Sequence, residues 1–219
     1  MLRRSTSAMA LEPLTPARRR QQTREYLLRA AAQVFAERGF HGASLDEVAS
    51  VAGFTKGAVY SNFKNKEDLF LALLEAHFER ELADVRTTLE TTEGSLDAQL
   101  SEFARLIHLQ EEGVGDSWAT LYEEFHLYAM RNPAVRQQLA DFYRVDVAAV
   151  AEIIEGERAR QGIEIPESAE DAARFVVALM RGISMMRAID PAVVTDAFLE
   201  TVMVFLARAL TGAGGGTPS

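Results

Sequence analysis

Residues 45–70 read LDEVASVAGFTKGAVYSNFKNKEDLF. Ala49, Gly53 and Val59 have the spacing of a helix-turn-helix. This motif needs a small residue where two helices cross, a residue that tolerates positive φ in the turn, and an apolar residue that closes the contact. Phe54 and Phe63 add apolar anchors to the same unit. An ordinary tight corner in a helical bundle uses the same residue types, so the spacing alone leaves both interpretations open.

The distribution of charge favours a DNA-binding unit. The 219 residues include 23 Lys and Arg against 32 Asp and Glu, and a net charge of -9 by itself argues against a nucleic-acid partner. Up to Lys66, however, eleven basic residues stand against five acidic ones, and the rest of the chain has twelve against twenty-seven. The chain's three lysines, Lys56, Lys64 and Lys66, all fall in the basic part. A packing corner does not need them, so we expect a basic head joined to an acidic body.

Caps and breakers divide the whole chain into helices, with no alternating strand pattern. Ser44 with Glu47 forms a capping box, and Gly39 and Gly53 stop the helices before them. We expect nine helices, at residues 23–38, 45–52, 56–62, 66–89, 95–112, 116–131, 133–160, 167–188 and 191–211. The predicted class is therefore all-α. The predicted divisions are a disordered basic arm (1–20), a helix-turn-helix DNA-binding domain (21–66), a helical effector-binding and dimerisation domain (67–211) and a disordered tail (212–219).

Residues 23–78 also match a known pattern. They contain an AAxxxFxxxGF entry, the small-residue helix-turn-helix and a GAVYxxFxxKEDL exit. This quarter of the chain resembles the DNA-binding domain of the TetR family of bacterial transcriptional repressors, whereas the later helices resemble the family only in number and layout. The resemblance implies a cytoplasmic homodimer that binds a palindromic double-stranded DNA operator and releases it when a small molecule enters the body. The alternative is a helical ligand-binding or enzymatic bundle without DNA binding.

Local chemistry and the resemblance together predict the DNA contacts. Lys56 can donate to guanine O6 and N7 or to a phosphate. Tyr60 is expected to bind a phosphate by resemblance, the alternative being a half-buried core tyrosine. Lys64 and Lys66 are expected at the phosphate backbone. The predicted set is Arg18, Arg19 and Arg20 on the mobile arm, with Ser44, Thr55, Lys56, Gly57, Tyr60, Asn62, Lys64 and Lys66.

Two further sites are predicted in the body. An aromatic cluster with a few polar tips suits a small, largely apolar effector, although core packing is the alternative for each member. Its residues are Phe103, Ile107, Trp118, Tyr122, Phe125, His126 and Phe142. The last two helices are apolar on two sides, and one side is expected to pack on a second copy of the chain. The predicted interface residues are Val176, Met180, Ile183, Phe198, Val202 and Phe205.

Catalytic and membrane functions find no support in the sequence. Cysteine is absent, and there is no HExxH, GxSxG or Gly-rich phosphate loop. Glu123 and His126 form a Glu-x-x-His unit, but a di-iron bundle needs two such units, so we expect a structural or pocket-lining role for His126. No stretch approaches the roughly 20 apolar residues of a membrane helix. We therefore expect no enzyme activity, cofactor, metal or membrane contact.

Overall fold

The computed structural model describes residues 15–94, 98–100, 102, 115–163 and 167–211. Within these ranges the regular structure is entirely helical, as the all-α prediction requires. The helices are α1 (Pro16–Gly42), α2 (Leu45–Ala52), α3 (Lys56–Tyr60), α4 (Lys66–Thr91), α6 (Gly115–Arg131), α7 (Pro133–Gln161), α8 (Ala169–Ile189) and α9 (Asp196–Thr211). Most of the helix expected at residues 95–112 lies outside the described residues. Among the described helices, none has the length and apolar character needed to cross a membrane.

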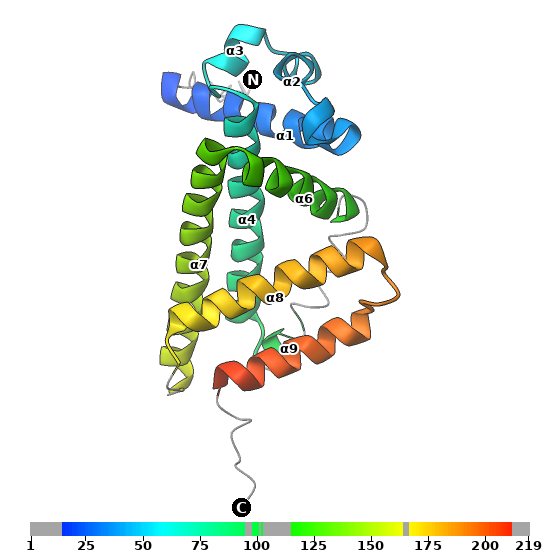
Figure 1. Cartoon of the computed structure of the whole chain (residues 1–219). Coiled ribbons are helices and arrows are strands. Elements are labelled where there is room, and N and C mark those ends of the chain that lie inside the picture. The colour runs from blue at the N-terminus through cyan, green and yellow to red at the C-terminus, as the bar shows by residue number, and fades with distance from the viewer. Residues whose placement is uncertain (1–14, 95–97, 101, 103–114, 164–166, 212–219) are drawn as a thin grey trace, which may run out of the picture.

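The helices form a head and a body that share α4 (Figure 1). α1, α2 and α3 make the head, and α4 runs from it to the opposite end of the molecule with α7 alongside. α6 crosses directly beneath the head and packs on both α1 and α7. α8 and α9 lie at the end of the body remote from α3.

Local signals in the sequence fix most helix ends. The Ser44 hydroxyl accepts from the Glu47 N–H, and the Glu47 carboxylate accepts from the Ser44 N–H, so the predicted capping box is present. Gly53 ends α2 in the left-handed conformation (φ 71°), and Gly39 interrupts α1 (φ 69°). Both glycines therefore stand where a side chain would strain the backbone.

Two predicted boundaries are wrong. α1 begins at Pro16 and not near residue 23, because Thr15 caps it and proline at the first position favours a helix start. α9 begins at Asp196 and not at Pro191. Asp190 instead ends α8, and its side chain accepts from the Ala192 N–H at 2.9 Å, which holds a turn before α9.

The main hydrophobic core joins the head to the body. Phe35 and Phe40 from α1 meet Phe70 of α4 and Phe125 of α6, and each is at most 1% exposed. The Phe40 ring centroid lies 5.3 Å from that of Phe70 and 5.0 Å from that of Phe125, in edge-to-face arrangements that aromatic pairs favour. The head is therefore packed directly onto the start of the body.

Candidate nucleic-acid interface and ligand cavity

The helix-turn-helix is built as the spacing predicts. Ala49 of α2 and Val59 of α3 are 2% and 0% exposed, and Phe63 is also buried beside them. Gly53 closes the turn, with its N–H directed at the carbonyls of Ala49 and Ser50. The two short helices are thus held rigidly against α1, which leaves the opposite face of α3 to solvent.

That outer face carries the residues predicted to read DNA. Thr55 caps α3 by accepting from the Ala58 N–H at 3.3 Å. Lys56 and Gly57 are exposed, and so is Tyr60, at 57%. The alternative of a half-buried core tyrosine at position 60 therefore does not hold. A lysine, a glycine and a tyrosine share one solvent-facing turn, where they can meet base edges or phosphates.

Lys56 has a partner in the free protein. Its ammonium forms an exposed ion pair with the carboxylate of Asp46 at the start of α2. The hydrogen bond to Asp46 raises the pKa of Lys56 above its usual value. Exposed pairs of this kind are weak, so a phosphate or a guanine can replace Asp46 at little cost.

Lys66 is placed differently from the phosphate contact that was predicted. Its ammonium donates to the carbonyl oxygens of His41 and Ala43, both at 3.1 Å, and lies 4.8 Å from the centre of the Phe40 ring. These are the carbonyls at the end of α1, which lack partners within the helix. We therefore interpret Lys66 as the residue that closes the end of α1, and not as a DNA contact.

The other predicted contacts divide into exposed and engaged groups. Lys64 is exposed. The Asn62 amide donates to the Ala58 carbonyl at 2.8 Å, which occupies it in closing the end of α3. Ser44 remains at the exposed start of α2, where capping and phosphate binding are compatible.

The predicted mobile arm is partly wrong. Arg18, Arg19 and Arg20 lie in the first turns of α1, because the Thr15 cap extends the helix through them. Arg20 donates to the Ser61 carbonyl at 3.2 Å, which ties the start of α1 to the end of α3. The three side chains are exposed and remain available to DNA, but from a helix and not from a flexible segment.

Head and body are also joined by polar contacts. The Glu124 carboxylate of α6 accepts from the Phe40 N–H at 2.6 Å, beside the kink at Gly39. The Tyr128 hydroxyl donates to Glu67 of α4, also at 2.6 Å. These contacts hold α6 to both α1 and α4. A displacement of α6 would therefore also displace the head.

The predicted effector residues that the structure describes are engaged in packing and in side-chain contacts. Phe125 is fully buried in the core between head and body, and Phe142 is buried against Phe78, so both are packing residues. Trp118 stacks on His77 with ring centroids 4.2 Å apart. Phe103 and Ile107 lie outside the described residues.

Tyr122 and His126 belong to a polar network between α6, α7 and α8. The Tyr122 and Tyr143 hydroxyls are 2.7 Å apart, and His126 bonds the Tyr143 hydroxyl through Nε2 and approaches the Tyr122 carbonyl through Nδ1. Both ring nitrogens of His126 are thus used within the protein, which supports the structural role. Burial lowers the pKa of His126.

An ion pair completes this network. The Arg181 guanidinium stacks on the rings of Tyr122 and Tyr143, at 4.5 and 4.4 Å, and donates to Asp146 at 2.5 Å. The Asp146 side chain is completely buried. Burial raises the pKa of Asp146 to about 7 and lowers the pKa of Arg181 to about 10, since it penalises both charges.

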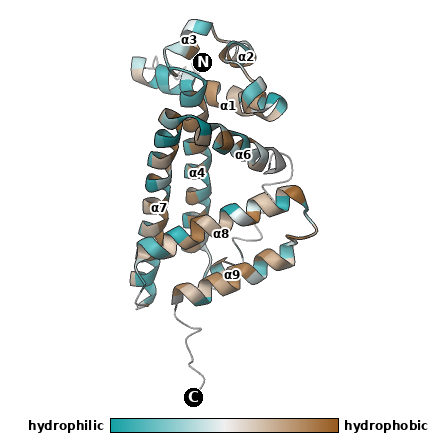
Figure 2. Cartoon of the chain, viewed as in Figure 1, coloured by the Kyte–Doolittle hydropathy of each residue, from teal (hydrophilic) through white to brown (hydrophobic). Residues whose placement is uncertain are grey.

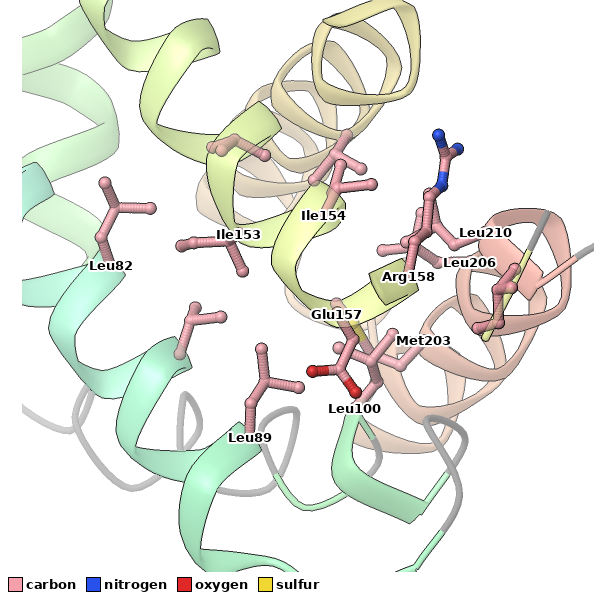
Figure 3. A pocket seen from close by; sticks show the side chains of 14 residues that line it. Leu82, Leu89, Leu100, Ile153, Ile154, Glu157, Arg158, Met203, Leu206 and Leu210 are labelled. Atoms are coloured by element: carbon pink, nitrogen blue, oxygen red, sulfur yellow. The ribbon is translucent and has the colours of Figure 1, made fainter. Parts of the chain in front are cut away.

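A cavity lies elsewhere, between the far end of α4 and helices α7, α8 and α9 (Figure 3). Of its 14 lining residues, 12 are aliphatic or methionine, and the other two are Glu157 and Arg158. They include Leu82, Leu89, Ile153, Ile154, Met203 and Leu206. The sequence does not reveal this cavity, because aliphatic residues at helical spacing give the same pattern whether they pack on each other or line a cavity. The signal that could have indicated it is the charged pair Glu157 and Arg158, which follows the apolar residues Ile153 and Ile154 on α7.

The residues of the predicted dimer interface fall into two groups. Phe198 and Phe205 of α9 are 42% and 63% exposed and stay candidates for an interface. Ile183 and Val202 are buried in the chain's own core, and Val176 and Met180 are packed against it. These four residues are corrections, because they lie on the inner faces of α8 and α9. The outer face of α8 instead exposes Phe175, Met185, Met186 and Ile189, and Figure 2 shows apolar residues along both helices.

Comparison with known proteins identifies the family. A sequence model described as "Bacterial regulatory proteins, tetR family" matches residues 27–73. A second, described as "BetI-type transcriptional repressor, C-terminal", matches residues 98–211, slightly more than half of the chain. The chain belongs to the TetR family. The head is therefore the DNA-binding domain of a TetR-family transcriptional regulator, and the body is its C-terminal ligand-binding domain.

Individual relatives resemble mainly the head. The activator FasR of Mycolicibacterium smegmatis is 42% identical over 73 residues, 33% of either chain. The repressor BepR of Brucella suis is 46% identical over 61 residues, 27% of this chain and 29% of BepR. The matches thus span about a third of these relatives. The structure of Salmonella enterica GusR is 28% identical with a TM-score of 0.62, and covers 93% of this chain and 98% of GusR. FasR and BepR are named as transcriptional regulators with a helix-turn-helix.

Proposed function

We propose that this TetR-family protein is a repressor that binds a palindromic operator as a homodimer and releases it when a largely apolar effector enters the body. The observation that carries the proposal is the outer face of α3. Lys56, Gly57 and Tyr60 are exposed there while Val59 anchors the helix from behind. Repression, rather than activation, is supported by the match of the body to the BetI-type repressor description.

Dimerisation follows from the outer face of α8 and α9. Phe175 is 55%, Ile189 76% and Phe205 63% exposed. Several large apolar side chains exposed on neighbouring helices are typical of a protein–protein contact surface. A second copy covers it by two-fold symmetry, and a two-fold pair of heads matches a palindromic site.

The effector response follows from the position of the cavity. α4 has 26 residues, so at 1.5 Å per residue it spans about 39 Å. Leu82 and Leu89 of α4 line the cavity, and Lys66 at the other end of the same helix contacts α1. A ligand that displaces the far end of α4 therefore shifts the head. By reciprocity, operator DNA must weaken ligand binding by the same factor.

DNA binding is tested by fluorescence anisotropy with the DNA immediately upstream of the coding region. If a dimer contacts about eight phosphates, log K should fall against log salt with a slope of about -7. Lys56→Ala should weaken binding, whereas Arg174→Ala, which removes an exposed charge from α8, should not. Binding that is absent, or equally affected by both substitutions, would refute the proposal in favour of a helical ligand-binding bundle without DNA binding.

A further inference from the structure

The cavity between α4, α7, α8 and α9 has a chemical character that specifies its ligand. Apart from Glu157 and Arg158, its described lining is aliphatic or methionine, with no aromatic ring among those residues. A flat aromatic ligand would find no ring to stack on, whereas a flexible hydrocarbon chain can follow such walls. Apolar contact without polar partners is what a polymethylene chain requires.

The size of the cavity sets the length of that chain. Its volume is about 120 Å³. Because an apolar cavity of about 150 Å³ binds the six carbons of benzene, this volume has room for roughly five carbon-sized groups. A short chain therefore fills the space as it stands.

Arg158 supplies a cation at the rim. In Figure 3 its guanidinium stands apart from the aliphatic side chains, beyond Ile154 and Leu210. Its Nη1 donates to the Glu167 carbonyl at 3.0 Å, but Nε and Nη2 are buried and have no hydrogen-bond partner among the residues that the structure describes. Buried donors without partners are rare and costly. These two nitrogens form one edge of the planar guanidinium, the edge that binds both oxygens of a carboxylate side by side.

The neighbouring acid does not neutralise this cation. The Glu157 carboxylate accepts from Arg160 through both Nε, at 3.0 Å, and Nη2, at 2.5 Å, and also from Gln161. Its side chain is only 10% exposed, and these hydrogen bonds go to Arg160 and Gln161. The free edge of Arg158 is therefore left for a ligand.

We infer that the effector is a short-chain aliphatic carboxylate of about five or six carbons, whose chain fills the cavity and whose carboxylate binds Nε and Nη2 of Arg158. This inference rests on the proposed effector response and names its ligand class. The two are separable, because ligand binding can be measured without DNA.

The test is isothermal titration calorimetry of the full-length chain with hexanoate, and with 1-hexanol as the uncharged ligand of equal length. Hexanoate should bind more tightly than hexanol by at least about tenfold. From propanoate to hexanoate, affinity should rise about fourfold for each added methylene, and the rise should stop near about six carbons.

Substitutions separate the charge from the chain. Arg158→Met should weaken hexanoate binding about tenfold to a hundredfold and leave hexanol within about threefold. Arg158→Lys, which keeps the charge but not the planar edge, should lie between Met and the native chain. Arg144→Met, which removes an exposed arginine elsewhere on α7, is the matched control and should change neither. Circular dichroism confirms that each variant is folded.

Equal affinity for hexanoate and hexanol, or an unchanged hexanoate affinity in a folded Arg158→Met variant, would overturn the inference. If hexanoate binds through Arg158 and the protein binds its operator but hexanoate does not release it, the ligand assignment stands and the proposed effector response fails. If another compound releases the operator and hexanoate does not bind, the proposed function stands and the ligand assignment fails.

Discussion

Replacing Lys66 with methionine should destabilise the head without changing how operator binding depends on salt. The substitution keeps the aliphatic stem and removes the ammonium that donates to His41 and Ala43 and lies over the Phe40 ring. A hydrogen bond to a charged group is worth about 1.5–3 kcal/mol and a cation–π contact about 0.5–1 kcal/mol when exposed. Because Lys66 is only partly buried, water replaces some of this, and we expect a loss of about 2 kcal/mol. In a chain of this size that lowers Tm by about 4–8 °C.

Lys56→Met is the matched comparison. Lys56 is fully exposed and its ion pair with Asp46 is replaceable, so Tm should stay close to that of the native chain. Operator affinity should fall. If Lys56 contacts one phosphate in each head, the slope of log K against log salt should become shallower by about 1.8 for a dimer.

The assays are thermal unfolding followed by circular dichroism, and anisotropy titrations with operator DNA between 50 and 200 mM salt, a range over which phosphate contacts are readily detected. The two lysines should respond oppositely: Lys66→Met in Tm, Lys56→Met in the salt slope. A Lys66→Met variant of unchanged Tm and shallower slope would show that its contacts with α1 give way to DNA, and the interpretation of Lys66 as a structural residue would be wrong.

Three further predictions concern the body and its junction with the head. Gly39→Ala should lower Tm, because a Cβ there would lie 2.8 Å from the Glu124 carboxylate and the backbone has a φ of +69°. At Gly156 nothing lies within 4 Å of a Cβ, so Gly156→Ala should raise stability by up to about 1 kcal/mol. Equal changes in Tm for the two variants would contradict this reasoning. Burial raises the pKa of Asp146 from 3.8 to about 7, so between these values the folded state holds a proton that the unfolded chain has lost, and stability falls as pH rises through this range and is constant above it. Urea unfolding from about pH 4.5 to about pH 7.5 should therefore show the native chain losing stability relative to Asp146→Asn, and parallel curves would refute the shift. Phe205→Glu should give monomers by light scattering at micromolar concentration, and a persistent dimer would place the interface elsewhere.

The sequence was most informative where function depends on local geometry. The capping box at Ser44, the turn at Gly53 and the packing of Val59 each involve residues close together in the chain, so their spacing predicts their structure. The exposed Tyr60 follows from the same helical register. The role of Lys66 could not be predicted, because its partners are the backbone carbonyls of His41 and Ala43, which are 25 and 23 residues away in the chain. A backbone acceptor leaves no pattern of side chains in the sequence.

The ligand cavity and the dimer surface depend on long-range packing, which periodicity does not determine. On α8, Val176 and Ile183 face inward while Phe175 and Met186 face outward, yet all four are apolar. Either stripe satisfies the helical pattern, and only the position of α7 and α9 selects one. The aromatic cluster was mistaken for a pocket for the same reason: Phe125 fills the contact between head and body instead of lining a space.

The aromatic contact of Phe40, Phe70 and Phe125 bears on how such regulators can be recombined. A cut after Lys66 separates head from body along the chain, but in space Phe125 and Glu124 of α6 complete the floor of the head. A graft of residues 16–66 onto another regulator would bring Phe40 without the Phe70 and Phe125 rings that pack on it. It would also leave the Phe40 N–H without the Glu124 carboxylate that accepts its hydrogen bond. Exchange of DNA specificity between relatives should therefore preserve residues 121–129 with the head they support, or be limited to the outer face of α3.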